Sequence, residues 1–210
     1  MNKQLALVTG GIGGLGTEIC RQLAKSGKRV IAADLGSRSD RVSEFLDEVS
    51  EFSDDISFEP LDVSSFEECT TSLKAITDKH GPISILVNAA GITRDTSLRK
   101  MSERQWSDVI TVNLDGVFNT CRALVDGMTE RGFGRIVNIS SVNGQTGQFG
   151  QTNYSAAKAG MHGFTMALAR EVARKGVTVN SVSPGCCGTA LVMAVPQAVR
   201  EQSVANIPVG

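Results

Sequence analysis

Three side chains that could share one proton lie close together in the sequence. Tyr154, the single tyrosine of the chain, precedes Lys158 by four residues, so in a helix both side chains would lie on one face. A nearby cation lowers the pKa of a phenol, which would make Tyr154 a general acid or base. Ser141, at the end of an expected strand, could hydrogen-bond a substrate carbonyl oxygen. A tyrosine and a lysine at this spacing most often form only a surface pair, so the surrounding elements must decide.

The composition indicates one α/β domain over residues 1–210. The net charge is -1 and no basic run is interleaved with aromatic residues, so nucleic acid is not an expected partner. No apolar run reaches the ~20 residues that cross a bilayer, and no cleavable signal precedes the first strand, so we expect a cytoplasmic protein without a membrane partner. The number of cysteines is odd, and Cys20, Cys69 and Cys121 fall in helical patterns, which fits core residues better than disulfides. No metal site is expected because metal-ligand spacing is missing.

A glycine-rich loop separates the first expected strand, residues 5–9, from the helix behind it. Glycines let the backbone approach a pyrophosphate, whose charge the N–H groups and the dipole at a helix start then stabilise. A glycine loop alone is weak evidence, but its place between a strand and a helix is the one that a dinucleotide site requires. The loop residues predicted to bind this cofactor are Gly10, Ile12, Gly14, Leu15 and Gly16.

An acidic residue ends the second expected strand, residues 29–33. Asp34 follows Gly16 by eighteen residues, where a carboxylate would accept a hydrogen bond from the adenosine ribose. The same charge would repel a 2′-phosphate, so NAD(H) is slightly favoured over NADP(H). Arg38 and Arg41 weaken this preference because a loop that folds back could pair them with a phosphate.

Polar residues also follow the third and fourth expected strands, residues 56–61 and 83–87. Asp62 either reaches the adenine or caps a turn, and the two interpretations are equally supported. Asn88 can hold open a turn of small residues that allows a ligand to come close to the backbone. A long helical pattern from Ser102 to Met128 places Trp106 and Leu124 in one core stripe. Asn113 interrupts this pattern, where it lies either on a solvated face or at a kink with a water or a lysine as its partner.

Strands and helices alternate along the whole chain, with further strands expected at 135–139 and 177–182. This order predicts a Rossmann-type doubly wound parallel sheet of six strands, with right-handed crossovers and helices on both faces. Ligands of such sheets bind outside the carboxyl ends of the strands, where Ser141 would lie. His162, beside the core stripe of the helix that carries Tyr154, is expected to be a packed interface residue rather than a catalyst.

Taken together and in this order, the motifs resemble the short-chain dehydrogenase/reductase family over essentially the whole chain. The resemblance implies four catalytic residues, Asn113, Ser141, Tyr154 and Lys158. The further cofactor contacts that it implies are Asp62, Val63, Asn88, Ala89, Gly91, Tyr154, Lys158, Pro184, Gly185 and Thr189. In the implied oxidoreductase, Lys158 lowers the pKa of Tyr154 and binds the ribose, while Asn113 holds a water that feeds protons to Lys158.

Within the family, the chain most resembles the enzymes that reduce short 3-oxoacyl-CoA thioesters, above all acetoacetyl-CoA in polyhydroxyalkanoate synthesis. Thioesters of the acyl carrier protein are the alternative substrates. The substrate contacts implied by this resemblance are Arg94, Asn143, Gln148, Phe149, Gln151 and Cys186. Cys186 stands where an aromatic residue is expected, so one wall of the acyl pocket differs.

Two other functions compete with this one. A sugar, polyol or steroid ketone would keep the chemistry and change the substrate. A regulator that binds the cofactor without chemistry would show a broken catalytic set, whereas the set here is whole. Family members continue through a further helix and a seventh strand that builds much of a tetramer interface, so a homotetramer is expected if that segment is present. Without it, the strand at 177–182 should form an exposed edge.

Overall fold

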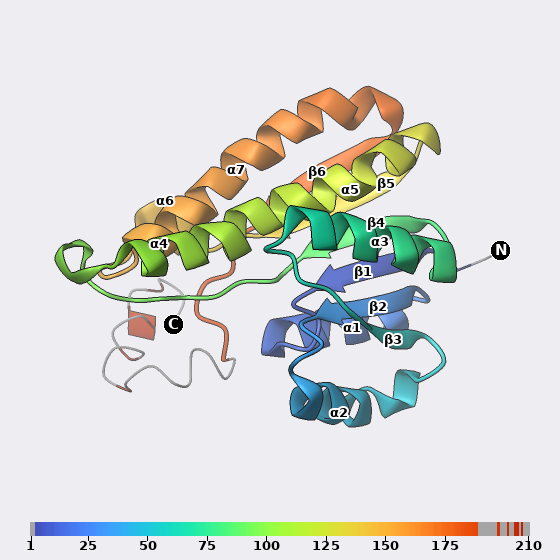
Figure 1. The fold of residues 1–210 in the computed structure, drawn as a ribbon, viewed down its shortest axis with the longest axis horizontal. Coiled ribbons are helices and arrows are strands. Elements are labelled where there is room, and N and C mark those ends of the chain that lie inside the picture. The colour runs from blue at the N-terminus through green and yellow to red at the C-terminus, as the bar shows by residue number, and fades with distance from the viewer. Residues whose placement is uncertain (1–2, 189–196, 198–200, 202–203, 206, 208–210) are drawn as a thin grey trace.

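The computed structural model describes residues 3–188, 197, 201, 204, 205 and 207. They contain a single parallel sheet of six strands in the order β3-β2-β1-β4-β5-β6, with helices on both faces (Figure 1). This is the predicted Rossmann-type doubly wound α/β fold. No helix in the described ranges is both long and apolar enough to cross a membrane. Thr189, predicted to contact the nicotinamide, lies outside the described residues.

All six expected strands are present, and their bounds differ from the expected ones by at most one residue. The strands are β1 (Leu5–Thr9), β2 (Arg29–Asp34), β3 (Ile56–Pro60), β4 (Ile83–Asn88), β5 (Gly134–Ile139) and β6 (Val177–Val182). Thr9 pairs with Asn88, which pairs with Asn138 on the next strand. This register brings the carboxyl ends of β1, β4 and β5 side by side at one edge of the sheet, and the ladder continues into β6.

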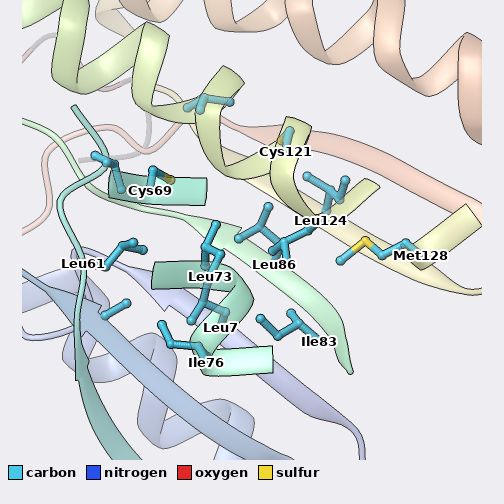
Figure 2. Packing of buried hydrophobic residues seen from close by; sticks show 14 of the residues in the cluster. Leu7, Leu61, Cys69, Leu73, Ile76, Ile83, Leu86, Cys121, Leu124 and Met128 are labelled. Atoms are coloured by element: carbon cyan, nitrogen blue, oxygen red, sulfur yellow. The ribbon is translucent and has the colours of Figure 1, made fainter. Parts of the chain in front are cut away.

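Three long helices cover one face of the sheet: α3 (Phe66–His80), α5 (Gly116–Glu130) and α7 (Thr152–Val172). Figure 2 shows how Leu7 and Leu86 from the strands pack against Leu73 of α3 and Leu124 of α5. Three of these side chains are completely inaccessible, and burying a leucine contributes about 1.5–3 kcal/mol. The core under these helices therefore fixes α5 and α7 against the sheet.

The opposite face carries α1 (Gly14–Lys25) and α2 (Ser39–Glu48). Cys20 of α1 and Phe45 of α2 are fully buried against the alanine and valine side chains of β1 and β2. Cys20, Cys69 and Cys121 are free thiols in the core, as expected from the sequence. The shorter elements are η1 (Ser50–Phe52), η2 (Leu98–Lys100), α6 (Asn143–Thr146) and η4 (Ala173–Lys175).

The long helical pattern of residues 102–128 is divided by a change in helix type. It begins as α4 (Glu103–Ile110), passes through a π-helical segment (Thr111–Asp115) and continues as α5. Trp106, expected in the same core stripe as Leu124, is instead 40% exposed. The wider turn of a π segment rotates α4 relative to α5, so a stripe counted at α-helical spacing does not continue across it.

Candidate active site

Ser141 and Tyr154 come from two neighbouring elements at the carboxyl edge of the sheet. Ser141 follows β5 and is buried, while Tyr154 lies in the first turn of α7. The backbone N–H of Asn143 donates to Ser141 Oγ at 3.2 Å, so one acceptor site of the hydroxyl is filled and its proton remains free to donate. The Ser141 side chain is close enough to Tyr154 to lower the pKa of its phenol. The structure thus brings the two predicted hydroxyl groups together.

The pKa of Tyr154 is raised above its ordinary value. Burial is the main cause because it disfavours the charged phenolate, and the negative charge of Asp95 acts in the same direction. The Ser141 side chain opposes both effects without cancelling them. Tyr154 is therefore protonated at neutral pH, which suits a group that donates a proton rather than one that removes it.

Lys158 lies one turn further along α7 and is only 4% exposed. Its Nζ donates to the carbonyl oxygen of Ile139 at 2.7 Å and lies 5.6 Å from the centre of the Tyr154 ring. Burial lowers the pKa of Lys158 to about 8. The prediction that Lys158 lowers the pKa of Tyr154 is wrong for this structure, because burial of the phenol dominates and the net shift is upward.

These two shifts predict a pH dependence for the reaction that the family resemblance implies. We expect kcat/KM to be steady at lower pH and to fall as the pH rises through about 8, because Lys158 then loses its charge while Tyr154, whose pKa is raised, keeps its proton. The measurement is a pH profile of kcat/KM for the wild type and for Lys158→Arg, whose guanidinium stays charged. In the variant the fall should move to higher pH, and an unmoved fall would assign it to another group.

Asn113 connects the π segment to the turn that follows β4. The residue is completely buried, its Oδ1 accepts from Ile92 N at 2.8 Å, and its Nδ2 donates to Ile92 O at 2.8 Å. A Cβ placed on Gly91 would lie 2.8 Å from Asn113 Oδ1 and 3.7 Å from Lys158 Nζ. The backbone at Gly91 therefore lies close to the side chains of both Asn113 and Lys158. The Asn113 side chain fixes the backbone of Ile92, and its predicted role in holding a water stays a prediction.

The glycine loop has the close backbone approaches that its sequence predicts. A Cβ on Gly16 would lie 2.1 Å from the Gly10 carbonyl oxygen, and Gly10 itself has a φ of 65°. The first N–H groups of α1, including those of Gly14 and Leu15, have no carbonyl partner within the helix and can receive a pyrophosphate. Ile12 is completely buried and its carbonyl oxygen accepts from Arg41 Nε at 2.8 Å, so its contact with the cofactor stays a prediction. The loop fits a dinucleotide.

Asp34 and Asp62, the two residues predicted to contact the adenosine, both form hydrogen bonds within the protein. Asp34 Oδ1 accepts from Leu35 N at 2.9 Å and lies 3.2 Å from the Arg38 guanidinium. Asp62 Oδ1 accepts from the N–H and the hydroxyl of Ser64 at 2.8 and 2.6 Å. Asp62 therefore caps a turn, as one of its two interpretations states, and its contact with adenine remains a prediction. Val63 is buried in the core.

Asn88 belongs to a buried polar network that its sequence position does not reveal. Its Nδ2 donates to Asn138 Oδ1 at 2.9 Å, and its Oδ1 accepts from Thr120 Oγ1 at 2.7 Å. Asn138 Nδ2 in turn donates to Thr165 Oγ1 at 2.9 Å, which connects β4, β5, α5 and α7. The Asn88 side chain thus supports the strand end, and cofactor contacts at this turn are left to the backbone around Ala89.

The predicted substrate residues fall into two groups. Asn143 and Gln151 are half-buried and joined by a bond of 2.9 Å, and Gln151 also donates to Asp95 Oδ2 at 2.8 Å. The others lie on the surface around the loop ends: Arg94, Gln148, Phe149 and Cys186 are exposed, and Phe149 is 90% exposed. Pro184 joins the site because its carbonyl accepts from Val142 N at 3.1 Å, and Gly185 follows it.

Two residues at the site are missing from the sequence prediction. Asp95 raises the pKa of Tyr154 and accepts from Gln151. Asn153 is completely buried, and its Nδ2 donates to the carbonyl oxygens of Arg94 and Gln105 at 3.2 and 3.0 Å, which joins the start of α7 to the segment after β4. Nothing in the spacing of either residue along the chain indicates these contacts.

Comparisons with known proteins agree with this geometry. A family model described as short chain dehydrogenase matches residues 4–200. The acetoacetyl-CoA reductase of Allochromatium vinosum is 55% identical over 205 residues, covering 98% of this chain and 83% of that enzyme. The acetoacetyl-CoA reductase of Cupriavidus necator is 51% identical over 209 residues, covering 100% and 85%. A crystal structure of actinorhodin polyketide ketoreductase with NADPH is similar at a TM-score of 0.87 and 37% identity, covering 99% of this chain and 78% of that one.

Proposed function

The chain belongs to the short-chain dehydrogenase family, and from this premise we propose that it reduces the 3-keto group of a short acyl-CoA, acetoacetyl-CoA above all, to the 3-hydroxy thioester. The observation that carries the proposal is the paired hydroxyls of Ser141 and Tyr154 beside a buried lysine, in a chain more than half identical to two acetoacetyl-CoA reductases. A bound NAD(P)H supplies the hydride. The experiment is a cofactor-oxidation assay with acetoacetyl-CoA against a panel of sugar, polyol and steroid ketones.

Side chains of the protein donate the proton and stabilise the charge that develops on the ketone oxygen. In this proposal, Ser141 donates a hydrogen bond to the ketone oxygen, and Tyr154 transfers its proton to the same oxygen as that oxygen gains negative charge. The raised pKa of Tyr154 keeps this proton available at neutral pH. The buried ammonium of Lys158 then lies near the phenolate that remains, and opposite charge stabilises it. The product is the 3-hydroxyacyl-CoA.

The proposed cofactor preference is NAD(H), because the carboxylate of Asp34 at the end of β2 would accept a hydrogen bond from a free 2′-hydroxyl and repel a 2′-phosphate. Arg41 already contacts other groups of the protein: it donates to Ile12 O at 2.8 Å and pairs with Glu48 at 2.9 Å. Arg38 is the more exposed of the two arginines and holds Asp34 at 3.2 Å. Of this pair, only Arg38 can turn toward a 2′-phosphate without breaking a contact to the glycine loop.

We therefore expect a higher kcat/KM with NADH than with NADPH in the wild type. Arg38→Ala should lower kcat/KM for NADPH by roughly tenfold and leave the value for NADH nearly unchanged, because NADH has no 2′-phosphate to bind. Steady-state kinetics with both cofactors test this. A strong NADPH preference that survives Arg38→Ala would show that neither Asp34 nor Arg38 sets the choice.

The basic segment after β4 supports recognition of the CoA portion. Arg94, Arg99 and Lys100 are exposed, and Arg94 donates to the carbonyl oxygen of Thr93 at 3.0 Å and lies 3.6 Å from Asp108. Exposed cations attract phosphates, and salt screens that attraction. In this proposal the three side chains meet the phosphates of CoA outside the acyl site.

A comparison of thioesters tests this recognition. We expect kcat/KM for acetoacetyl-CoA to exceed that for a truncated acetoacetyl thioester without the nucleotide by roughly tenfold or more, and KM to rise with salt. The double variant Arg99→Ala/Lys100→Ala should raise KM for acetoacetyl-CoA only. Equal efficiency for both thioesters would remove CoA recognition, and faster turnover of an acyl-carrier-protein thioester would favour that alternative substrate.

A tetramer is proposed as the assembly. Phe118 of α5, Met166 of α7 and Trp106 of α4 are large apolar side chains that are exposed in the single chain. Large apolar side chains that are exposed on the surface of a single chain favour contact with another subunit. Light scattering after size-exclusion chromatography measures the number of subunits.

A further inference from the structure

We propose that His162 is a positioning residue of the active site: its Nε2–H orients the Ser140 hydroxyl, which in turn holds the backbone of Lys158 against the strand end that carries Ser141. The inference rests on the reductase function proposed above. It goes beyond that function because His162 contacts none of the reacting groups and acts on them through Ser140.

The imidazole of His162 lies among three hydroxyl groups. His162 is half-buried on α7, with Nε2 3.1 Å from Ser140 Oγ and 3.5 Å from Ser183 Oγ. Its Nδ1 lies 3.1 Å from Ser181 Oγ. Ser140 directly follows β5, Ser181 belongs to β6, and Ser183 directly follows β6. One side chain of α7 thus contacts both strand ends.

The count of protons decides which ring nitrogen donates. Ser140 has a single hydroxyl proton, and it donates that proton to the backbone carbonyl of Lys158 at 2.9 Å, since a carbonyl oxygen can only accept. At its contact with His162, Ser140 must therefore accept, and Nε2 must carry a hydrogen. In the neutral imidazole, Nδ1 then has no hydrogen and accepts the proton of Ser181.

The segments joined in this way are the ones that hold the catalytic groups. Lys158 is bonded to the end of β5 twice, through Nζ to Ile139 O at 2.7 Å and through its carbonyl to Ser140. The residues on either side of Ser141 are bonded to the β6 side, Ser140 N to Val182 O at 2.7 Å and Val142 N to Pro184 O at 3.1 Å. Ser141 is thus held from both sides.

The turn after Ser141 leaves no room for α7 to shift toward it. A Cβ placed on Gly144 would lie 2.8 Å from the carbonyl carbon of Lys158, so the two backbones are already in contact. On the other side, the Ser140 hydroxyl makes one of the hydrogen bonds that hold α7 to β5, and it is the one that binds the α7 backbone at Lys158. Because a misplacement of about 1 Å can cost roughly 10²-fold in rate, losing this bond should affect turnover even though His162 lies outside the reacting groups.

Two substitutions separate the two ring nitrogens. The amide nitrogen of glutamine takes the place of Nε2, whereas that of asparagine takes the place of Nδ1. We expect His162→Asn to lower kcat about tenfold with an unchanged cofactor Kd, and His162→Gln to stay within about threefold of the wild type. His80→Gln is the matched control, since His80 is the only other histidine and pairs with Glu59 away from the site. Equal losses in both variants, or a loss in cofactor binding alone, would overturn the proposal.

Two spectroscopic readouts need no turnover. Nitrogen NMR of the two imidazoles, assigned with His80→Gln, should show neutral His162 with its hydrogen on Nε2, and the other tautomer would overturn the proposal. Absorbance titration of Tyr154, the only tyrosine, should give a still higher pKa in His162→Asn than in the wild type, because a displaced Ser141 no longer counteracts burial. An unchanged titration would also overturn it. A wild type that reduces no ketone would defeat the reductase function alone, and these two readouts would still decide the role of His162.

Discussion

Replacing Tyr154 by phenylalanine is expected to lower kcat for ketone reduction by roughly 10²-fold or more while the cofactor Kd stays near that of the wild type. The ring keeps its packing, and only the proton donor is lost. Because burial raises the pKa of Tyr154, the wild-type phenol holds its proton throughout the neutral range, so the loss should be similar at every neutral pH. Single-turnover oxidation of bound NADH or NADPH measures the step directly.

The matched control for this prediction is Ser155→Ala, one residue further along α7. Its hydroxyl is buried and makes no hydrogen bond to any described residue, so kcat should stay close to that of the wild type. Comparable losses in Tyr154→Phe and Ser155→Ala would mean that α7 is simply sensitive to substitution. Turnover of Tyr154→Phe within a few-fold of the wild type would show that another group supplies the proton.

Lys158→Ala should reduce kcat by roughly 10²-fold and weaken cofactor binding as well. Lys158 is proposed to support the phenolate left on Tyr154 and to contact the ribose, so its removal affects chemistry and binding together. It also leaves the carbonyl of Ile139 without the ammonium that donates to it at 2.7 Å. Cofactor titration and steady-state kinetics on the same preparation separate the two effects.

A companion variant distinguishes charge from packing. Lys158→Met keeps most of the side-chain volume and removes a buried charge, so its thermal stability should match or exceed that of the wild type. Its kcat should nevertheless fall as far as in Lys158→Ala. A Lys158→Met protein with wild-type turnover would show that the lysine is needed only to fill space, and unchanged cofactor binding in both variants would remove the ribose contact.

Local patterns in the sequence determine the framework of this protein. The branched and apolar run at 5–9 predicts a strand with the observed bounds, because a strand buried on both faces needs a continuous apolar run. The glycines at positions 10 and 16 indicate close backbone approach, which follows from the lack of a side chain. Helical spacing places Tyr154 and Lys158 on one face of α7, since this depends only on the period of the helix.

The tertiary structure decides what depends on groups far apart in the chain. The direction of the Tyr154 pKa shift is one example, because the burial that raises this pKa comes from every segment packed around the phenol, whereas the spacing to Lys158 predicts a downward shift. Trp106 is another, because a π segment between it and α5 changes the rotation of the helix. The tautomer of His162 is a third, since it follows from a proton that Ser140 gives to a carbonyl eighteen residues away in sequence. Spacing along the chain predicts which residues can meet, whereas burial and hydrogen-bond direction are set by the assembled core.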